Sequence, residues 1–130
     1  MTRSARILVV DDEVGAPTAL ADMLRDEGFE VEMAADAFKG LGKYEAFTPH
    51  VVITDLQMPG MNGIDLMNKI REAEDPPAVI VMTAFGDVGT AVEAMHAGAA
   101  DYLTKPLNFD ELLVVVKKVI STQELVRETR

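Results

Sequence analysis

The stretch ILVVDDE, residues 7–13, sets the fold class of this chain. Its four consecutive apolar residues predict a strand that is covered on both faces, as in a parallel sheet packed between helices. Two more unbroken apolar runs follow at residues 51–53 and 79–82. Residues 29–33 alternate between apolar and glutamate side chains, which is typical of a half-exposed edge strand, and residues 100–103 supply a fifth predicted strand.

Apolar residues at helical spacing separate these strands. We expect helices over residues 37–47, 64–73 and 88–97, a first helix from Ala16 to just before Gly28, and a last helix that begins after the cap at Asn108. Four residues of the fourth helix are expected to face the core: Val88, Ala91, Val92 and Met95. Two glycines weaken the second helix, Gly40 and Gly42.

The strict alternation of five strands with five helices predicts an α/β protein. We expect the flavodoxin-like, doubly wound (βα)5 arrangement, a parallel five-stranded sheet in the order 2-1-3-4-5 with helices on both faces. Residues 1–120 form one predicted domain. The polar residues 121–130 are expected to extend the last helix or to start a linker to an output domain.

Composition excludes several kinds of function. The chain has 130 residues and no cysteine, so disulfides, zinc–thiolate sites and thiol nucleophiles are ruled out. Twelve Lys and Arg against 22 Asp and Glu give a net charge of −10, so we expect no direct nucleic acid binding by this domain. No apolar stretch approaches the ~20 residues of a membrane span and no signal-peptide pattern is present, so we expect a cytoplasmic protein with no membrane partner.

Charged and polar residues follow the predicted strands where they end. In the 2-1-3 strand order the first and third strands are neighbours, which brings Asp11, Asp12 and Asp55 together. Each pair of like charges at ~4 Å costs about 4 kcal/mol at an effective dielectric of 20, so a cation is needed. Oxygen ligands without His or Cys select a hard ion such as Mg²⁺.

Two further strand ends carry polar groups of the same kind. Thr83 follows the fourth strand and Lys105 the fifth, where Pro106 stops the ladder of hydrogen bonds. Each residue alone is common at the end of a strand. Their occurrence on four strand ends of one sheet indicates a functional site.

The same residues carry a resemblance to a known family. The matching stretches are residues 7–13, 52–55, 58–63, 82–84 and 101–106. In this order and spacing they resemble the response-regulator receiver domain over residues 5–120. Residues 83–87 and 98–106 resemble most the receivers of the nitrogen-regulatory (NtrC-like) class.

The resemblance implies a phosphorylation site. Asp55 would be the phosphoacceptor, attacking the phosphohistidine of a sensor histidine kinase. Asp12, Asp55 and the backbone carbonyl of Gln57 would bind Mg²⁺ directly, while Asp11 would act through a metal-bound water. No organic cofactor is implied.

The resemblance also implies a switch. Lys105 would pair with Asp55 at rest and with a phosphoryl oxygen afterwards, and the Thr83 hydroxyl would donate to another oxygen. Tyr102 would then turn inward, although an aromatic residue late in a sheet is more often part of the core. The surface of the fourth helix, fifth strand and fifth helix would repack for homodimerisation or for output to a linked ATPase and DNA-binding region that controls transcription.

Some residues are expected to have structural roles only. Gly63 is expected to supply a positive φ in the turn before the third helix, and the bond to Pro106 is expected to be cis, as in the family. His50 and His96 have no partners at ligand or catalytic spacing, so they are interpreted as surface residues.

Alternatives of other classes remain. A Mg²⁺-dependent aspartyl-phosphate phosphatase of the haloacid-dehalogenase type would need a second Asp two residues after the nucleophile, where this chain has Gln57. We therefore expect no enzyme beyond its own phosphoryl transfer and slow autodephosphorylation, in which Gln57 and Phe85 would flank the route of water. A phosphorylation-independent, receiver-like interaction module is a further alternative, although this chain keeps every acidic, Thr and Lys member of the site. A flavodoxin-like electron carrier is disfavoured because no phosphate-cradling loop follows the first strand.

Overall fold

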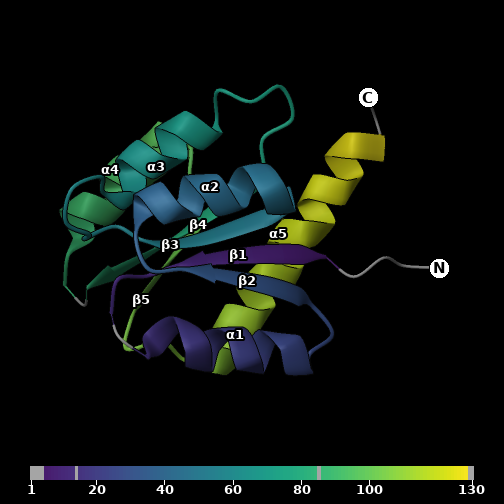
Figure 1. Ribbon diagram of the computed structural model, residues 1–130, viewed down its shortest axis with the longest axis horizontal. Coiled ribbons are helices and arrows are strands. Elements are labelled where there is room, and N and C mark those ends of the chain that lie inside the picture. The colour runs from purple at the N-terminus through teal and green to yellow at the C-terminus, as the bar shows by residue number, and fades with distance from the viewer. Residues whose placement is uncertain (1–4, 14, 85, 129–130) are drawn as a thin grey trace.

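The structure is a computed structural model that describes residues 5–13, 15–84 and 86–128. Strands and helices alternate along the chain (Figure 1). The strands are β1 (Arg6–Val10), β2 (Glu30–Ala34), β3 (Val51–Asp55), β4 (Ala78–Ala84) and β5 (Asp101–Lys105). The helices are α1 (Ala16–Asp26), α2 (Ala37–Phe47), α3 (Gly63–Ile70), α4 (Val88–Ala97) and α5 (Phe109–Glu128).

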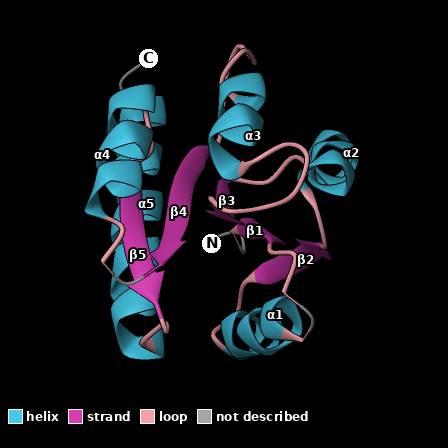
Figure 2. Ribbon diagram, turned by 90° about the vertical axis from the view of Figure 1, so that its left-hand side faces the viewer, coloured by secondary structure: helices cyan, strands magenta, loops and turns pink. Residues whose placement is uncertain are grey.

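The five strands form one parallel sheet in the order β2-β1-β3-β4-β5, which confirms the predicted topology. Helices cover both faces. Figure 2 shows α2 and α3 on one side of β1 and β2 and α1 on the other. Because the strands are buried from two sides, unbroken apolar runs form β1, β3 and β4.

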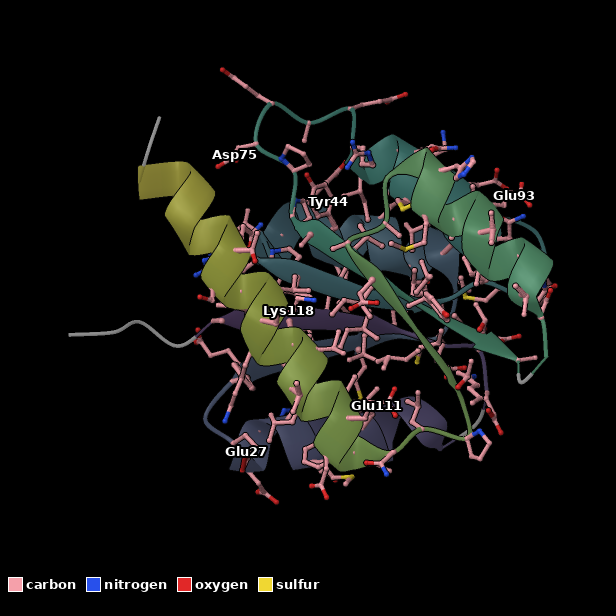
Figure 3. All side chains as sticks on the ribbon, turned by 180° about the vertical axis from the view of Figure 1, so that it is seen from behind. Glu27, Tyr44, Asp75, Glu93, Glu111 and Lys118 are labelled. Atoms are coloured by element: carbon pink, nitrogen blue, oxygen red, sulfur yellow. The ribbon has the colours of Figure 1, made fainter. Side chains whose placement is uncertain are left out.

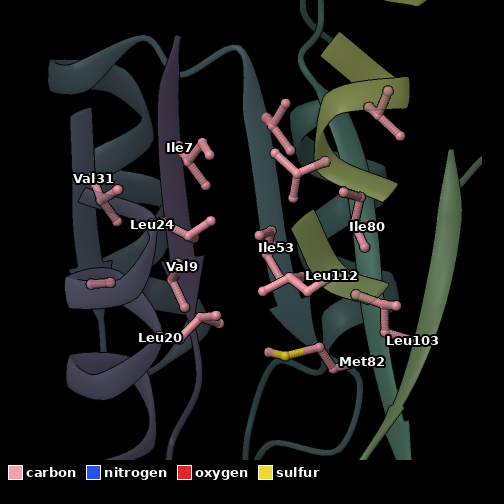
Figure 4. Close-up of a cluster of buried hydrophobic side chains, with 14 residues drawn as sticks. Ile7, Val9, Leu20, Leu24, Val31, Ile53, Ile80, Met82, Leu103 and Leu112 are labelled. Carbon is pink, nitrogen blue, oxygen red and sulfur yellow. The ribbon is translucent and has the colours of Figure 1, made fainter. Parts of the chain in front are cut away.

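Alternate residues of the strands point into two separate apolar clusters. Ile7, Val9 and Ile53 belong to the cluster under α1 and α5, where they meet Leu24 and Leu112 (Figure 4). The second cluster lies under α2, α3 and α4 and takes the intervening strand residues. The two clusters fix the register of the sheet and so fix which residues emerge at its carboxyl edge.

Helix α2 forms in full despite its glycines. Asp36 caps it by accepting a hydrogen bond from the Lys39 backbone N–H at 2.7 Å. Gly40 is buried against β1, and a Cβ there would lie 3.0 Å from Val10 Cγ2. The glycine that weakens the helix therefore lets it approach the sheet closely.

The prediction of the inward face of α4 is wrong in part. Ala91 and Ala94 face the core, whereas Val88, Val92 and Met95 are 70%, 49% and 38% exposed. A face of small alanines packs against β4 and leaves the larger apolar side chains outside. Helical periodicity identified an apolar helix without showing which side of it is covered.

Boundaries differ from prediction at other elements. Helix α3 ends at Ile70, three residues before the expected Ala73, and β5 runs to Lys105 instead of ending at Leu103. Helix α5 continues to Glu128, while Thr129 and Arg130 lie outside the described residues. Exposed charged side chains, among them Glu93, Glu111 and Lys118, line the outer sides of α4 and α5 (Figure 3). Within the described ranges, no helix has both the length and the apolar character needed to cross a membrane.

Candidate functional site

Three elements of the sheet bring one cluster of charges together. Asp11 directly follows β1, and its N–H donates to the Ala34 carbonyl of β2 at 3.1 Å. Asp55 ends β3, and Lys105 ends β5 opposite Ala84 of β4. Parallel strands end at the same edge, so residues separated by up to 94 positions meet there.

Lys105 is held by two buried carboxylates. Its Nζ lies 3.0 Å from Asp11 Oδ2 and 3.0 Å from Asp55 Oδ2, and 3.5 Å from Glu13 Oε2. Asp11 and Asp55 are only 3% and 8% exposed, whereas Glu13 is on the surface. The two inner pairs are desolvated, so they differ from a surface salt bridge, which contributes little.

The charged form of Lys105 is stabilised at this site, whereas the charged form of Asp55 is not. Burial raises the pKa of Asp55 above its ordinary value of 3.8, and the hydrogen bond and charge of Lys105 offset only part of this. For Lys105, burial alone would lower the pKa, but the hydrogen bonds and charges of Asp55 and Asp11 together raise it well above 10.5. The site therefore holds a firmly protonated ammonium beside a carboxylate that is destabilised as an anion.

Asp12 completes an oxygen-only donor set. One carboxylate oxygen from each of Asp11, Asp12 and Asp55 lies within 4.8 Å of the others, with Asp12 exposed to solvent. The second oxygen of Asp55, Oδ1, accepts a hydrogen bond from the Gln57 backbone N–H at 3.2 Å. This donor set fits a hard divalent cation that keeps several waters, because Lys105 pairs with only two of the three carboxylates and the third, Asp12, is open to solvent.

Thr83 and Tyr102 differ sharply in exposure. The Thr83 side chain is buried, and its Oγ1 has no hydrogen-bond partner among the described residues. A buried hydroxyl without a partner costs free energy, so the Thr83 hydroxyl is a candidate donor to a group that binds at this edge of the sheet. Tyr102 is 45% exposed, so it is not part of the core in this structure.

The role predicted for Gly63 is wrong. Its φ is not positive, and it is the first residue of α3. A Cβ at this position would collide with the Asp55 backbone oxygen and lie 2.9 Å from Leu56 Cα. Close approach of α3 to the end of β3 therefore requires the glycine.

The positive φ in this loop belongs to Gly60, at 78°. Sequence reasoning missed this residue, although the dipeptide Pro59-Gly60 is a turn signal that could have identified it. The bond between Lys105 and Pro106 is cis, in agreement with expectation.

Neither His50 nor His96 is part of the carboxylate–lysine site. His96 is exposed as expected, but His50 is only half-buried and accepts a hydrogen bond at Nδ1 from the Arg6 N–H at 2.9 Å. The interpretation of His50 as a surface residue is therefore wrong in part, because its ring is half-buried and accepts this hydrogen bond. Its hydrogen bond ties the start of β1 to the chain before β3, which is a structural role.

A cavity of about 650 Å³ opens beside the charges. The residues that line it are Asp11, Glu13, Leu20, Asp55, Gln57, Ala84, Lys105, Pro106 and Leu107. Its size is that of a small-molecule site, and it contains both the carboxylate and the ammonium group. The arrangement suits the binding of an anionic group between Lys105 and a cation at the carboxylates.

Comparison with known families agrees with this geometry. The family described as the response regulator receiver domain matches residues 7–117. The chain therefore belongs to the receiver domains of two-component response regulators, and the resemblance seen in the sequence is confirmed.

Individual relatives show which class of response regulators this chain resembles. The regulatory protein AtoC of Escherichia coli is 38% identical over 130 residues, which cover 100% of this chain and 28% of that protein. The nitrogen assimilation regulatory protein NtrX of Azorhizobium caulinodans is 33% identical over 126 residues, 95% of this chain and 28% of that protein. The likeness to the nitrogen-regulatory class is thus confirmed. The chain spans less than a third of the length of these two relatives.

Solved structures of response regulators also resemble this chain. NtrX from Brucella abortus superposes with a TM-score of 0.91 at 34% identity, over 98% of this chain and 29% of that one. A receiver domain protein from Clostridium thermocellum gives a TM-score of 0.88 at 34% identity, over 94% of this chain and 98% of that one.

Proposed function

We propose that Asp55 is the phosphoacceptor of this receiver domain and that a sensor histidine kinase is its donor. The observation that carries the proposal is the position of Asp55: its carboxylate lies at the cavity, 3.0 Å from Lys105 and within the Asp11–Asp12 cluster. Burial raises the pKa of Asp55, so the anion is held in an environment that solvates it poorly. A poorly solvated carboxylate is a better nucleophile toward phosphorus.

The donor set supports Mg²⁺ as the cofactor. Asp12, Asp55 and the Gln57 backbone carbonyl would hold the ion, with Asp11 acting through a bound water. When bound, Mg²⁺ supplies positive charge that neutralises the carboxylates and the phosphoryl oxygens. The chain itself orients the Asp55 oxygens, one through the Gln57 N–H and one through Lys105.

After transfer, two residues would bind the phosphoryl group. Lys105 would exchange its hydrogen bond to Asp55 for one to a phosphoryl oxygen. The Thr83 hydroxyl would donate to a second oxygen, and the missing partner of its buried Oγ1 supports this role. Tyr102 would follow Thr83 inward.

The surface of α4, β5 and α5 would carry the signal, and its exposed apolar side chains support a role in homodimerisation. Val88, Val92 and Met95 project from α4, and Tyr102 and Val114 from β5 and α5. Several large apolar side chains exposed on neighbouring elements are typical of interaction sites.

The output is proposed from the relatives. AtoC is named a regulatory protein, and ZraR, which matches at 37% identity over 119 residues, a transcriptional regulatory protein. We infer that residues 1–120 act as the receiver of a cytoplasmic transcription regulator. Residues 121–130 would extend α5 toward a linked ATPase and DNA-binding region.

Catalysis would be limited to the domain's own phosphorylation and slow autodephosphorylation. Gln57 lines the cavity where a phosphatase of the haloacid-dehalogenase type needs its second Asp, which argues against turnover of small substrates. Phe85, the other residue expected beside the route of water, lies outside the described residues.

A phosphorylation test decides between these functions. With Mg²⁺ and acetyl phosphate, the protein should gain one phosphoryl group by intact mass, and Asp55→Asn should abolish the gain while the circular dichroism spectrum stays unchanged. Asp26→Asn, a change of an exposed carboxylate at the end of α1, is the matched control and should be labelled normally. Normal labelling of Asp55→Asn would show that another residue is the acceptor, and no labelling of the wild type would favour an interaction module that needs no phosphorylation.

A further inference from the structure

One wall of the cavity beside Asp55 has no part in binding the phosphoryl group. The charged wall is formed by the Asp11, Asp55 and Lys105 side chains. Leu20 of α1 and Leu107 of the β5–α5 connection line the same cavity and supply its apolar part together with Pro106. The total volume, about 650 Å³, leaves room for a donor larger than the phosphoryl group itself.

We propose that this apolar wall is a subsite for the leaving group of the phosphodonor and that it selects donors with an apolar leaving group. The proposal rests on the proposed function, because it assumes that Asp55 attacks the phosphorus. The ligand class is that of acyl phosphates with an aliphatic tail: the phosphoryl end faces Lys105, and the tail lies on Leu20 and Leu107.

The wall is built to stay in place. Leu20 is 8% exposed and belongs to the core cluster under α1 (Figure 4). Leu107 packs against the same cluster and is half-buried, so part of its side chain faces the cavity. Two leucines anchored in one core offer a preformed surface, which lowers the entropy cost of binding.

Charge on the rest of the lining disfavours other leaving groups. Glu13 lines the cavity and is exposed, and the buried Asp11 lines it as well. A leaving group with a second carboxylate would be repelled by these groups, whereas an aliphatic tail would not. The cavity therefore combines a cationic end for phosphate with a neutral, apolar side.

The transfer step balances without a further reactant. A bond forms between an Asp55 oxygen and phosphorus, and the bond from phosphorus to the acyl oxygen breaks. The electron pair leaves with the carboxylate product, so no proton has to move. The tail would stay on the apolar wall throughout, and each methylene that leaves water completely would raise the second-order rate constant about fourfold.

Acetyl phosphate and butyryl phosphate provide the test, because their leaving groups are acids of nearly equal strength and only the tail differs. Second-order rate constants for phosphorylation of Asp55 would be measured by intact mass at saturating Mg²⁺. We expect butyryl phosphate to react about five- to tenfold faster than acetyl phosphate with the wild type. Leu107→Ser should bring this ratio close to one. Val114→Ser, a change of a 67% exposed residue on α5, should leave it unchanged.

A binding measurement supports the kinetic one. The methyl resonances of Leu20 and Leu107 should shift with 2-oxopentylphosphonate, a butyryl phosphate analogue whose bridging oxygen is replaced by CH₂, and shift less with 2-oxopropylphosphonate. If Leu107→Ser does not fold, Leu107→Ala takes its place in both measurements.

The outcomes separate this inference from the proposed function. Labelling of the wild type by both donors at equal rates, or an unchanged ratio in the Leu107 variant, would overturn the subsite and leave Asp55 as the acceptor. Absence of Asp55 labelling by either donor would overturn the proposed function itself.

Discussion

At the scale of single residues, Asp55 and Lys105 show how the site departs from what is best for stability. Burial disfavours the ionised form of Asp55, and Lys105 compensates incompletely because Asp11 shares it. A group whose pKa is raised on folding contributes stability that is fully present below its unfolded pKa and is lost as pH rises through the folded value. The anion of Asp55 therefore costs stability at neutral pH, where the proposed chemistry needs it.

Asp55→Asn should consequently stabilise the metal-free protein. Near neutral pH we expect a gain of roughly 0.5–2 kcal/mol, as is common when an active-site charge is removed. The gain should shrink as pH falls toward 3.8, because the wild-type side chain then becomes neutral as well. Urea unfolding at several pH values in the presence of a chelator measures it. A constant gain at all pH values would contradict the assigned cost of the Asp55 charge.

Magnesium should stabilise the folded wild-type protein by binding to the carboxylate cluster. A ligand that binds only the folded state stabilises it by about 2.7 kcal/mol at a hundred times its Kd. We expect a rise in the thermal midpoint for the wild type and a much smaller one for Asp12→Asn, which loses a proposed direct ligand. Asp26→Asn should behave as the wild type does. Equal rises in all three proteins would exclude the Asp11–Asp12–Asp55 cluster as the binding site.

At the scale of elements, the junction between β3 and α3 places Asp55. Asn62 and Asp65 form a capping box at the start of α3, with the Asn62 side chain accepting from the Asp65 N–H at 2.9 Å. The N–H of Gly63 donates to the Leu56 carbonyl at 3.1 Å, which holds the helix against the end of the strand. The helix terminus thus fixes the backbone that carries Asp55, the proposed phosphoacceptor.

Gly63→Ala should therefore disturb this junction. The added Cβ meets backbone atoms that cannot rotate away, so we expect a loss of about 1–3 kcal/mol and slower labelling of Asp55. Gly42→Ala is the matched control: it lies in α2 with nothing within 4 Å of the added Cβ, and should stabilise the protein by roughly 0.5–1 kcal/mol. Chemical denaturation measures whether each substitution lowers or raises the free energy of unfolding. A stable, normally labelled Gly63→Ala would show that the junction yields without cost.

At the scale of the whole molecule, the proposed phosphorylation site and the apolar surface of α4, β5 and α5 share one strand, β5. Lys105 and Tyr102 are in β5, and Thr83 is in the neighbouring strand β4, so a change at the carboxyl edge would act on an element that bears the surface. Moving a two-state equilibrium from 1:99 to 99:1 needs about 5.5 kcal/mol of differential stabilisation. A phosphoryl group that gains charge-assisted hydrogen bonds from Lys105 and Thr83 is able to supply much of this.

Association should follow phosphorylation. We expect sedimentation analysis to show more dimer for the phosphorylated protein, and Val92→Asp to weaken this dimer at least tenfold without preventing labelling. Met23→Asp, at a 41% exposed apolar residue on α1, is the control and should dimerise normally. Unchanged dimerisation of Val92→Asp would place the interface elsewhere.

Lys105 links the chemistry to this response. Lys105→Ala should still be labelled at Asp55 in part, because the cation site remains. The chemical shifts of α4 and β5 should respond far less to phosphorylation, since the contact from the phosphoryl group to the end of β5 is lost. A full response would remove Lys105 from the proposed switch.

Sequence alone determined the fold class, the order of the strands and the meeting of Asp11, Asp55 and Lys105 at one edge. Each follows from local rules: apolar runs predict buried strands, and parallel strands end on the same side. The tertiary structure alone decided which face of α4 is covered, why Gly63 and Gly40 are glycines, and where Leu20 and Leu107 meet. These depend on how closely two elements approach and on which side chains fill the space between them, and residue spacing along the chain does not contain that information.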